Sequence, residues 1–407
     1  MTIVTDILEQ MPAVRQPQGK FLTVLFATLL ALRGHVTGRN LSRYCHYSER
    51  TIARQFRATL AWADFPQRVL TTALDPRSEL ISAQDASFIP KSGKQTFGLG
   101  YFFNGCAGRA ERGVEISTVA VVDVTRRCAF TLAVAQTPPG EDKATTRRDK
   151  EETRIDFSKQ QLRAQRQRWP ERIRYHCVEG YFAKKKYLDE VVALKRHPIT
   201  KLRRAADWRF LYCGPHPQRR GRKRKYDGKV YFHDLRRFAY LGPLEAADHG
   251  HLYTAVVWHM ALKQKLRVVG LINRKAPTKP RYVVLASTDL ALDGHKVVEL
   301  YAARFQIEFL FRESKQFTGL SDCQARAQAA LDFHFNASLA TLNLVRAEEL
   351  RAQTEPTPRV FSMASWKQRK FNERLLDVFI DRLALDPTWV KNQPYYDELR
   401  TYGAIAA

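Results

Sequence analysis

The spacing of apolar residues separates a helical N-terminal segment of the chain from an α/β remainder. Residues 1–75 carry apolar positions at helical spacing, and the largely apolar run 21–32 is too short to span a bilayer and predicts a core helix. From residue 79 the period of the pattern changes to two, which predicts strands and therefore an α/β domain. These strands are expected over residues 80–85, 114–123, 128–135 and 173–178.

The pattern of the second half predicts more strands and then a helical end. A helix is expected around residues 187–194, and strands resume near residues 253–259, 267–273 and 282–287. An apolar stripe at helical spacing follows over residues 371–383. The predicted division is a helical domain (residues 1–75), an α/β region (76–199), a β-rich insertion (200–285), a second α/β region (286–345) and a C-terminal helical region (346–407).

The charge of the chain indicates a polyanionic partner. The net charge is +26, from 67 Lys and Arg against 41 Asp and Glu. Such a surface repels itself unless polyanions offset the field, and neutralising nucleic-acid phosphates releases counterions, so nucleic acid is the expected partner. No basic amphipathic stretch ends in a hydrophobic anchor, so no membrane partner is expected. The six cysteines include no C-x-x-C pair, which argues against structural zinc and disulfides and indicates the reducing cytoplasm.

Residues 40–57 predict a helix-turn-helix. Ser48 is a good N-cap for a second helix that carries Arg50, Arg54 and Arg57. In a helix-turn-helix the second helix enters a DNA groove, where such side chains meet bases and phosphates. The alternative is a plain helical hairpin with a basic, solvated face; we favour DNA binding.

A second basic region lies inside the expected insertion. Between residues 203 and 229 there are ten Lys or Arg and two Asp, a local charge of +8. Phosphate contacts from such a region carry no sequence information, so they would hold DNA of any sequence. The most concentrated basic residues are Arg219, Arg220, Arg222, Lys223, Arg224 and Lys225.

Four residues of the second α/β region have a spacing that suggests chemistry. On a single helix, Arg304, Glu308 and Lys315 would all fall within about 60° of Tyr301. A metal ion held by Glu308, with Arg304 and Lys315 reaching for phosphate oxygens, would explain this set. The alternative is an amphipathic helix with a solvated charged face.

The same pattern resembles the Y-(2)-R-(3)-E-(6)-K signature of DDE transposases of the insertion-sequence-four group. Residues 285–289 (LASTD) and 304–312 (RFQIEFLFR) resemble this group as well. The resemblance implies an RNase-H-like mixed sheet flanked by helices, built from residues 76–199 and 286–345 and preceded by a helical DNA-binding domain. In such folds three acids hold two divalent metals, which implies Mg²⁺, with Mn²⁺ as a substitute.

The first of the three acids implied by the resemblance is Asp85. Residues 82–94, which include Lys91 and Lys94, resemble the first-acid block of the group, where an acid is followed by a basic, glycine-containing stretch. Without that stretch, an acid at the end of an apolar strand would be read as the cap of a turn. The resemblance therefore implies that Asp85 binds metal and that Lys91 and Lys94 contact DNA.

The second acid departs from the pattern of the group. Residues 178–185 (VEGYFAKK) resemble the D-x-x-F-x-x-K block, but Glu179 stands where the group has Asp. The longer side chain matters because Mg²⁺ requires near-octahedral geometry, and a misplacement of about 1 Å can cost roughly a hundredfold in rate. The third acid is Glu308, so the implied catalytic and metal-binding set is Asp85, Glu179 and Glu308.

The resemblance implies a DNA transposase of the cut-and-paste type. Such a protein binds the terminal inverted repeats of its element, cleaves double-stranded DNA and joins the freed 3′ hydroxyl to target DNA. A homodimer on DNA, a location at the nucleoid, and DNA contacts by Tyr301, Arg304 and Lys315 belong to the same expectation. The alternatives are a catalytically impaired, transposase-derived DNA-binding protein, because of Glu179, and a host nuclease of RNase-H-like fold. No G-x-S-x-G, H-E-x-x-H or P-loop motif suggests another chemistry.

Overall fold

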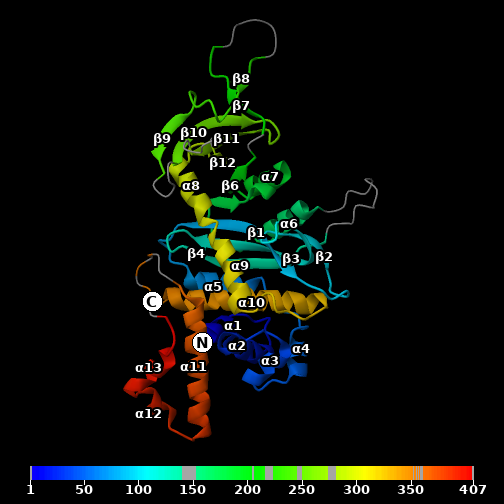
Figure 1. Cartoon of the computed structure of the whole chain (residues 1–407), viewed down its shortest axis with the longest axis vertical. Helices are drawn as coiled ribbons and strands as arrows, with labels where there is room; N and C mark the ends of the chain where they lie inside the picture. The colour runs from blue at the N-terminus through cyan, green and yellow to red at the C-terminus, as the bar shows by residue number, and fades with distance from the viewer. Residues whose placement is uncertain are drawn as a thin grey trace. The chain divides into compact units, whose positions relative to one another are not determined.

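The computed structural model has a mixed α/β fold with a large mixed sheet flanked by helices, which confirms the predicted fold class (Figure 1). The chain divides into a first unit (Met1–Ser78, Ala86–Arg154 and Gln306–Ala407) and a second unit (Glu79–Asp85 and Ile155–Phe305). Among the described residues, no helix has the length and apolar character needed to cross a membrane. The structure describes residues 2–139, 153–203, 206–215, 223–244, 250–273, 281–351, 353, 355, 357 and 361–405.

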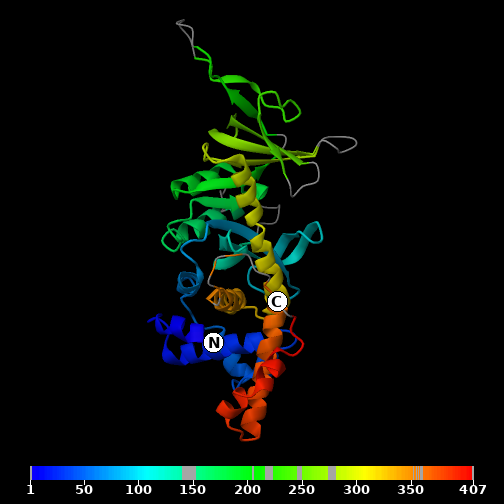
Figure 2. The same cartoon turned by 90° about the vertical axis from the view of Figure 1, so that its left-hand side faces the viewer.

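The first unit contains the two ends of the chain, both helical. The prediction of helices within residues 1–75 is confirmed, and α2 buries Phe21, Leu22, Leu25 and Phe26 as a core helix should. The C-terminal helix α11 packs against α2, and Figure 2 shows it in orange beside the blue N-terminal helices. The helices of this unit are α1 (Thr2–Glu9), α2 (Gln16–Ala31), α3 (Gly38–Tyr44), α4 (Glu49–Gln55), α5 (Asp64–Ala73), α9 (Gln306–Phe317), α10 (Gln328–Arg351), α11 (Met363–Arg382), α12 (Pro387–Lys391) and α13 (Pro394–Thr401).

The strands of the first unit are built around one long strand. The strand β3 (Arg109–Asp123) pairs antiparallel with β2 (Gly100–Asn104) and with β4 (Cys128–Gln136). A side chain of the buried helix α10 forms two hydrogen bonds with the backbone of β4. Asn343 Oδ1 accepts from the Thr131 N–H at 2.9 Å, and Asn343 Nδ2 donates to the Thr131 carbonyl at 2.7 Å. These two bonds satisfy backbone groups that would otherwise be buried without partners.

The strands of the second unit begin with the first half of β1 (Leu80–Pro90). The parallel portion joins β1 to β5 (Tyr175–Val178) and β5 to β6 (His197–Leu202). The rest of the path is antiparallel and runs through β12 (Arg281–Ser287), β11 (Gln264–Asn273), β10 (Gly250–His259), β7 (Trp208–Leu211) and β8 (Tyr226–Lys229), with β9 (Ala239–Pro243) paired to β10. The expected strands near 253–259, 267–273 and 282–287 are therefore confirmed.

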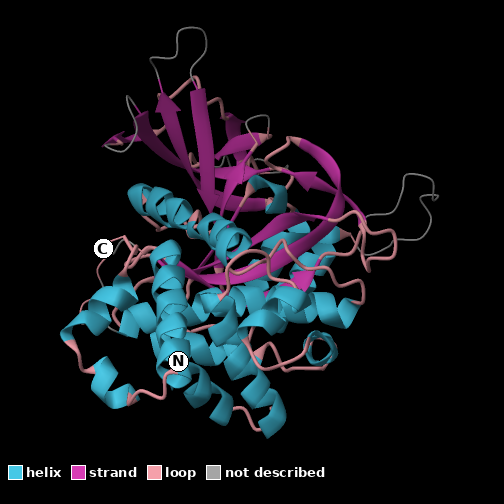
Figure 3. Ribbon diagram, turned by 60° about the horizontal axis from the view of Figure 1, so that its bottom comes forward, coloured by secondary structure: helices cyan, strands magenta, loops and turns pink. Residues whose placement is uncertain are grey.

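Helices cover the sheet of the second unit, and Figure 3 shows how helices and strands are distributed. The helix α7 (Lys185–Ala193) packs on β6, and α8 (Gly294–Ala303) packs on β12, β11 and β10. The helix α6 (Arg154–Ala164) precedes β5 in the chain. The strand β1 runs on to Pro90, five residues past Asp85. Asp85 therefore lies inside a strand, and the expectation that the strand ends at this residue is wrong.

One expectation about local structure is wrong. The four residues of the Tyr301 pattern do not lie on one helix, because α8 ends at Ala303 and α9 begins at Gln306. The Phe305 N–H bonds to the Ala302 carbonyl at 3.0 Å, which is a tight turn where a continuous α-helix would bond four residues back. Tyr301 thus belongs to α8 and Arg304 to the turn. Only Glu308 and Lys315 share a helix, α9.

Candidate active site

The pairing of β1 with β5 determines where two of the predicted acids lie. The strands are parallel, with Ser82 opposite His176 and Gln84 opposite Val178. Side chains alternate along each strand, so Asp85 and Glu179, one residue beyond the last pair, point to the same face. Neighbouring strands are about 4.8 Å apart, which brings these two carboxylates within reach of each other.

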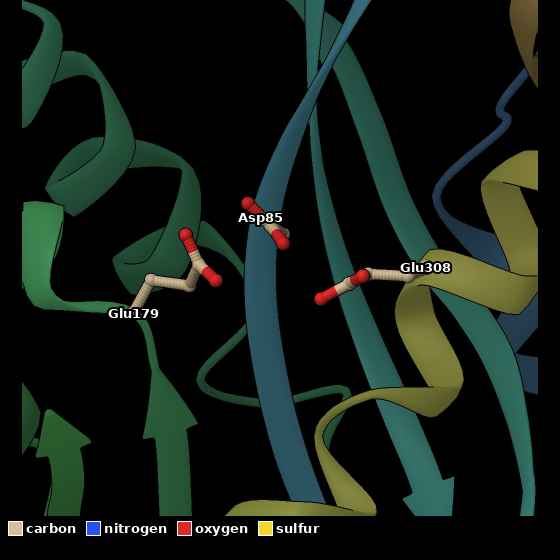
Figure 4. A group of neighbouring side chains, drawn as sticks. All are labelled: Asp85, Glu179 and Glu308. Atoms are coloured by element: carbon tan, nitrogen blue, oxygen red, sulfur yellow. The ribbon is translucent and has the colours of Figure 1, made fainter. Parts of the chain in front are cut away.

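The third acid joins them in the structure. Figure 4 shows the carboxylates of Asp85, Glu179 and Glu308 as neighbours, and one oxygen from each lies within 4.8 Å of the others. Asp85 comes from β1, Glu179 directly follows β5, and Glu308 lies in the first turn of α9. Asp85 and Glu308 are half-buried, whereas Glu179 is exposed.

This group of side chains fits a hard divalent cation. It offers only oxygen donors, which Mg²⁺ and Mn²⁺ prefer. Two ligands on opposite sides of Mg²⁺ lie about 4.2 Å apart, so oxygens within 4.8 Å of one another need only small side-chain rotations to share an ion. The donor set would not suit a soft metal, because no thiolate or imidazole belongs to it.

Arg304 neutralises two of the acids. Its Nη1 donates to Asp85 Oδ2 at 3.1 Å and its Nη2 donates to Glu179 Oε1 at 3.0 Å. The side chain is only 6 % exposed, and its guanidinium lies 5.6 Å from the centre of the Tyr301 ring. A buried guanidinium offsets the mutual repulsion of the two carboxylates and holds them in place. Contact of Arg304 and Tyr301 with DNA stays a prediction.

The backbone around Glu179 is also held in place. The Glu179 carbonyl accepts from Thr200 Oγ1 at 3.2 Å, and it also begins the short 3-10 turn Gly180–Phe182. A Cβ at Gly180 would lie 3.0 Å from the Lys201 carbonyl oxygen, which is tighter than most such contacts, so glycine eases the close approach of the chain to β6. Phe182 is buried, with its ring 5.0 Å from that of Tyr187. The departure from the Asp pattern therefore concerns only the side chain of Glu179.

A buried polar network lies on the other face of β1 and β5. Ser82 Oγ lies 2.8 Å from His176 Nδ1. His176 Nε2 lies 2.8 Å from the Tyr187 hydroxyl, which in turn donates to Gln84 Oε1 at 2.6 Å. The network links β1, β5 and α7, so it fixes the strand pair that carries Asp85 and Glu179.

The direction of each hydrogen bond in the network follows from its partners. Gln84 Nε2 donates to Gln161 Oε1 at 3.0 Å, so Gln84 Oε1 is the acceptor of the only proton on the Tyr187 hydroxyl. His176 Nε2 must then donate to Tyr187, and Nδ1 accepts from Ser82. This is the neutral form of the ring, and burial lowers the pKa of His176 to about 3. Both ring nitrogens of His176 are thus taken up by hydrogen bonds to Ser82 and Tyr187.

The helix-turn-helix candidate consists of α3 and α4. The Ser48 hydroxyl accepts from the Thr51 N–H at 3.2 Å, so the predicted N-cap is confirmed. Arg50, Arg54 and Arg57 are exposed and line an open hollow of about 600 Å³ on α4. Arg50 and Arg54 lie one turn apart on α4, whereas Arg57 lies in the turn after the helix, so its predicted place on the second helix is wrong although it lines the same hollow.

The other predicted DNA-binding residues differ in how accessible they are. Lys94 is exposed, whereas burial lowers the pKa of Lys91 and of Lys315. Lys315 Nζ donates to the Phe88 carbonyl of β1 at 2.8 Å. Within the basic insertion, Arg224 is exposed and lies 4.7 Å from the centre of the Tyr212 ring. Lys223 and Lys225 are exposed as well, and Arg219, Arg220 and Arg222 lie outside the described residues.

Two features of the site were missed from the sequence. One is the pairing of Arg304 with both acids, because the pattern was read as a single helix. The other is the network through Gln84, His176 and Tyr187. Its signal was present, since Ser82 and Gln84 are polar residues that alternate with apolar residues in β1.

Comparisons with known proteins point to one family. A family model described as "DDE superfamily endonuclease" matches residues 10–264, which include Asp85 and Glu179 and end before Glu308. A cryo-EM structure of a piggyBac transposase synaptic complex with hairpin DNA is similar at 11% sequence identity and a TM-score of 0.44, over 99% of this chain and 81% of that chain. A search of curated proteins found no match.

The neutral state of His176 predicts a pH dependence of folding. The pKa of His176 is about 3 in the folded protein and about 6.5 in an unfolded chain. Between these two pH values the unfolded chain binds one more proton at His176 than the folded protein does. The free energy of unfolding therefore falls as the pH falls below about 6.5, by up to about 1.4 kcal/mol per pH unit from this residue. Urea unfolding at about pH 7.5 and about pH 5 measures the effect.

Two variants test whether His176 causes this pH dependence of stability. His176→Gln should lose less stability on acidification than the unchanged protein, although it is less stable at neutral pH. His295→Gln, at an exposed position of the same unit, is the control and should keep the original pH dependence. An identical loss on acidification in all three proteins would contradict the assignment to His176.

Proposed function

The chain belongs to the DDE superfamily endonucleases, and from this membership we propose that it is a DNA transposase. In this proposal it binds the ends of its element, hydrolyses phosphodiester bonds there and joins the resulting 3′ hydroxyl to target DNA. The observation that carries the proposal is the group of three carboxylates, Asp85, Glu179 and Glu308. Resemblance to the insertion-sequence-four group supports the cut-and-paste type and the homodimer on DNA.

The proposed reaction needs the acids as metal ligands. Asp85, Glu179 and Glu308 would hold Mg²⁺, with Mn²⁺ as a substitute. A bound divalent ion lowers the pKa of attacking water and stabilises charge on the phosphate and the leaving oxygen. In the first step water forms a bond to phosphorus and the bond to the 3′ oxygen breaks, which leaves a 3′ hydroxyl. In the second step that hydroxyl attacks a target phosphodiester, and one target strand bond is broken for each bond formed.

Neighbouring residues of the chain hold the acids Asp85 and Glu179 in position. The buried guanidinium of Arg304 limits the repulsion between Asp85 and Glu179 before DNA arrives. The network through His176 and Tyr187 holds the strands from which both acids project. Misplacement of catalytic groups by about 1 Å can cost around a hundredfold in rate, so the buried residues His176 and Tyr187 would support the reaction without touching DNA.

A second function is favoured by Glu179. In this alternative the protein is a transposase-derived DNA-binding protein with an impaired active site. Glu179 is longer by one methylene than the Asp of the pattern, and its side chain is 49% exposed, so it is held less firmly than Asp85, at 18%. Cleavage assays separate the two functions.

Cleavage of end-containing DNA in Mg²⁺ or Mn²⁺ tests the proposal. Asp85→Asn and Glu308→Gln should each abolish cleavage, because each removes a charged metal ligand while keeping the size of the side chain. Glu179→Asp should raise cleavage in Mg²⁺, and Mn²⁺ should narrow the difference from the unchanged protein. The control is Asp189→Asn, which changes an exposed acid on α7 that pairs with Lys185.

The outcomes of the cleavage assay distinguish the alternatives. Cleavage that survives Asp85→Asn and Glu308→Gln would refute the role of the acids. No cleavage by the unchanged protein, together with cleavage by Glu179→Asp, would support the impaired DNA-binding protein. Lower cleavage by Glu179→Asp than by the unchanged protein would mean that the site is adapted to Glu179.

DNA binding should divide between the two basic regions. Neutralising Lys223, Arg224 and Lys225 should weaken binding to all sequences and reduce the slope of log K against log salt by about 2–3, because phosphate contacts release counterions. Arg50→Gln or Arg54→Gln should instead lose about 1–3 kcal/mol of discrimination for element ends over random DNA. Fluorescence anisotropy at several salt concentrations measures both quantities. Equal losses on both DNAs from both sets of variants would reject this division.

A further inference from the structure

A pocket in the first unit is lined mainly by arginine and apolar side chains, unlike the group of carboxylates around Asp85. Its volume is about 300 Å³. It is lined by the turn between β3 and β4, by α9 and by the end of α10. On α9, Phe309 and Arg312 line it, whereas Glu308 does not. Nothing in the proposed reaction uses this pocket.

Two of the four arginines that line the pocket are buried and paired. Arg126 and Arg346 are each 5% exposed. Arg126 Nη2 contacts Asp75 Oδ2 at 3.4 Å, and Arg346 Nη2 donates to Glu313 Oε2 at 2.8 Å. The Nε atoms of both arginines are buried, and neither has a hydrogen-bond partner among the described residues. These two arginines therefore have their charges paired inside the protein and contribute buried wall to the pocket.

The other two arginines of the pocket are exposed. Arg127 lies in the turn between β3 and β4 with a φ of 53°, and Arg312 stacks 4.4 Å from the centre of the Phe309 ring. Neither forms an ion pair with a described residue. The stacking limits the rotation of the Arg312 guanidinium, which lowers the entropy cost of binding a ligand with it.

The charges around the pocket are not balanced. Its lining holds four arginines and two glutamates, and Asp75 pairs with Arg126 from outside the lining, so four positive and three negative charges leave one positive charge in excess. One glutamate, Glu313, is paired with Arg346, and the other, Glu349, accepts from Trp366 Nε1 at 2.9 Å. Arg127 and Arg312 are therefore the two cations of the lining that no described acid pairs with. Leu350 and Phe361 add apolar wall to the same pocket.

We propose that this pocket binds a phosphate-bearing ligand of about the size of a mononucleotide, with the phosphate on Arg127 and Arg312. Two guanidinium groups can bind the oxygens of one phosphate, and a phosphate monoester carries about −1.5 to −2 charges at neutral pH, which the two unpaired cations would largely neutralise. A volume of about 300 Å³ lies at the lower end of small-molecule sites, so it exceeds what a lone ion needs. The apolar wall would contact the nucleoside.

The ligand could come from two sources with the same chemistry. One is a free nucleotide, and the other is a nucleotide unit of a DNA strand bound to the protein. Binding at this pocket does not depend on cleavage, so the Asp85→Asn protein is a suitable background for the test. Failure of the proposed reaction would leave the pocket proposal standing, and failure of the pocket proposal would leave the reaction standing.

The test compares a pocket variant with a matched charge variant. The pocket variant is Arg127→Asn with Arg312→Gln, because Asn tolerates a positive φ better than most residues. The matched variant is Arg374→Gln with Arg382→Gln, which removes two exposed arginines from α11. Calorimetric titration with adenosine 5′-monophosphate, with adenosine as the phosphate-free probe, measures nucleotide binding. Fluorescence anisotropy with a short DNA duplex measures strand binding.

Two results would support the proposal. In the first, the protein binds adenosine 5′-monophosphate but not adenosine, and the pocket variant binds the nucleotide at least tenfold more weakly than the matched variant does. The ligand is then a free nucleotide. The second is no nucleotide binding but DNA binding at least tenfold weaker in the pocket variant; the source is then a DNA strand. Equal affinities of the two variants for both probes would overturn the proposal. If the pocket variant does not fold, Arg312→Lys replaces it, and an unchanged affinity would then overturn the proposal.

Discussion

The parallel pairing of β1 with β5 is the constraint on which the candidate active site depends. It places Asp85 and Glu179 side by side on one face of the sheet, because Gln84 is paired with Val178 one residue before them. A shift of the pairing by one residue would send one carboxylate to the opposite face. The register is fixed on the other face, where the buried hydrogen bonds of His176 join the two strands and α7.

Charge is the second constraint on the site. Three carboxylates within 4.8 Å of one another repel strongly, and a protein meets that cost with cations. Arg304 supplies one of them and contacts Asp85 and Glu179 at once, which it can do because the chain turns between α8 and α9. A bound divalent ion would supply the rest of the compensation in the proposed reaction. The same reasoning applies to the pocket that Arg127 and Arg312 line, because their unpaired positive charges favour an anion.

The sequence predicted the elements of the fold that have a strong local pattern. The buried helix α2 and the strands β3, β4, β10, β11 and β12 have apolar periodicity, and they were expected close to where they lie. The short strands β2 and β6 were not expected, because their residues show no clear alternation and the pairing of neighbours decides their structure. The break after Ala303 was missed for a similar reason: both flanking segments favour helix, and long-range ion pairs of Arg304 accompany the turn. The three acids were found from the resemblance of short motifs, whereas their mutual distance comes only from tertiary structure.

The central claim is that Asp85, Glu179 and Glu308 form one metal-binding site. The most direct measurement is anomalous diffraction from crystals of the protein grown with Mn²⁺ and a DNA duplex. The account predicts an anomalous peak in contact with a carboxylate oxygen of Asp85 and with at least one of Glu179 and Glu308. Peaks only at other positions, or an Asp85 and a Glu308 too far apart to share an ion, would contradict it.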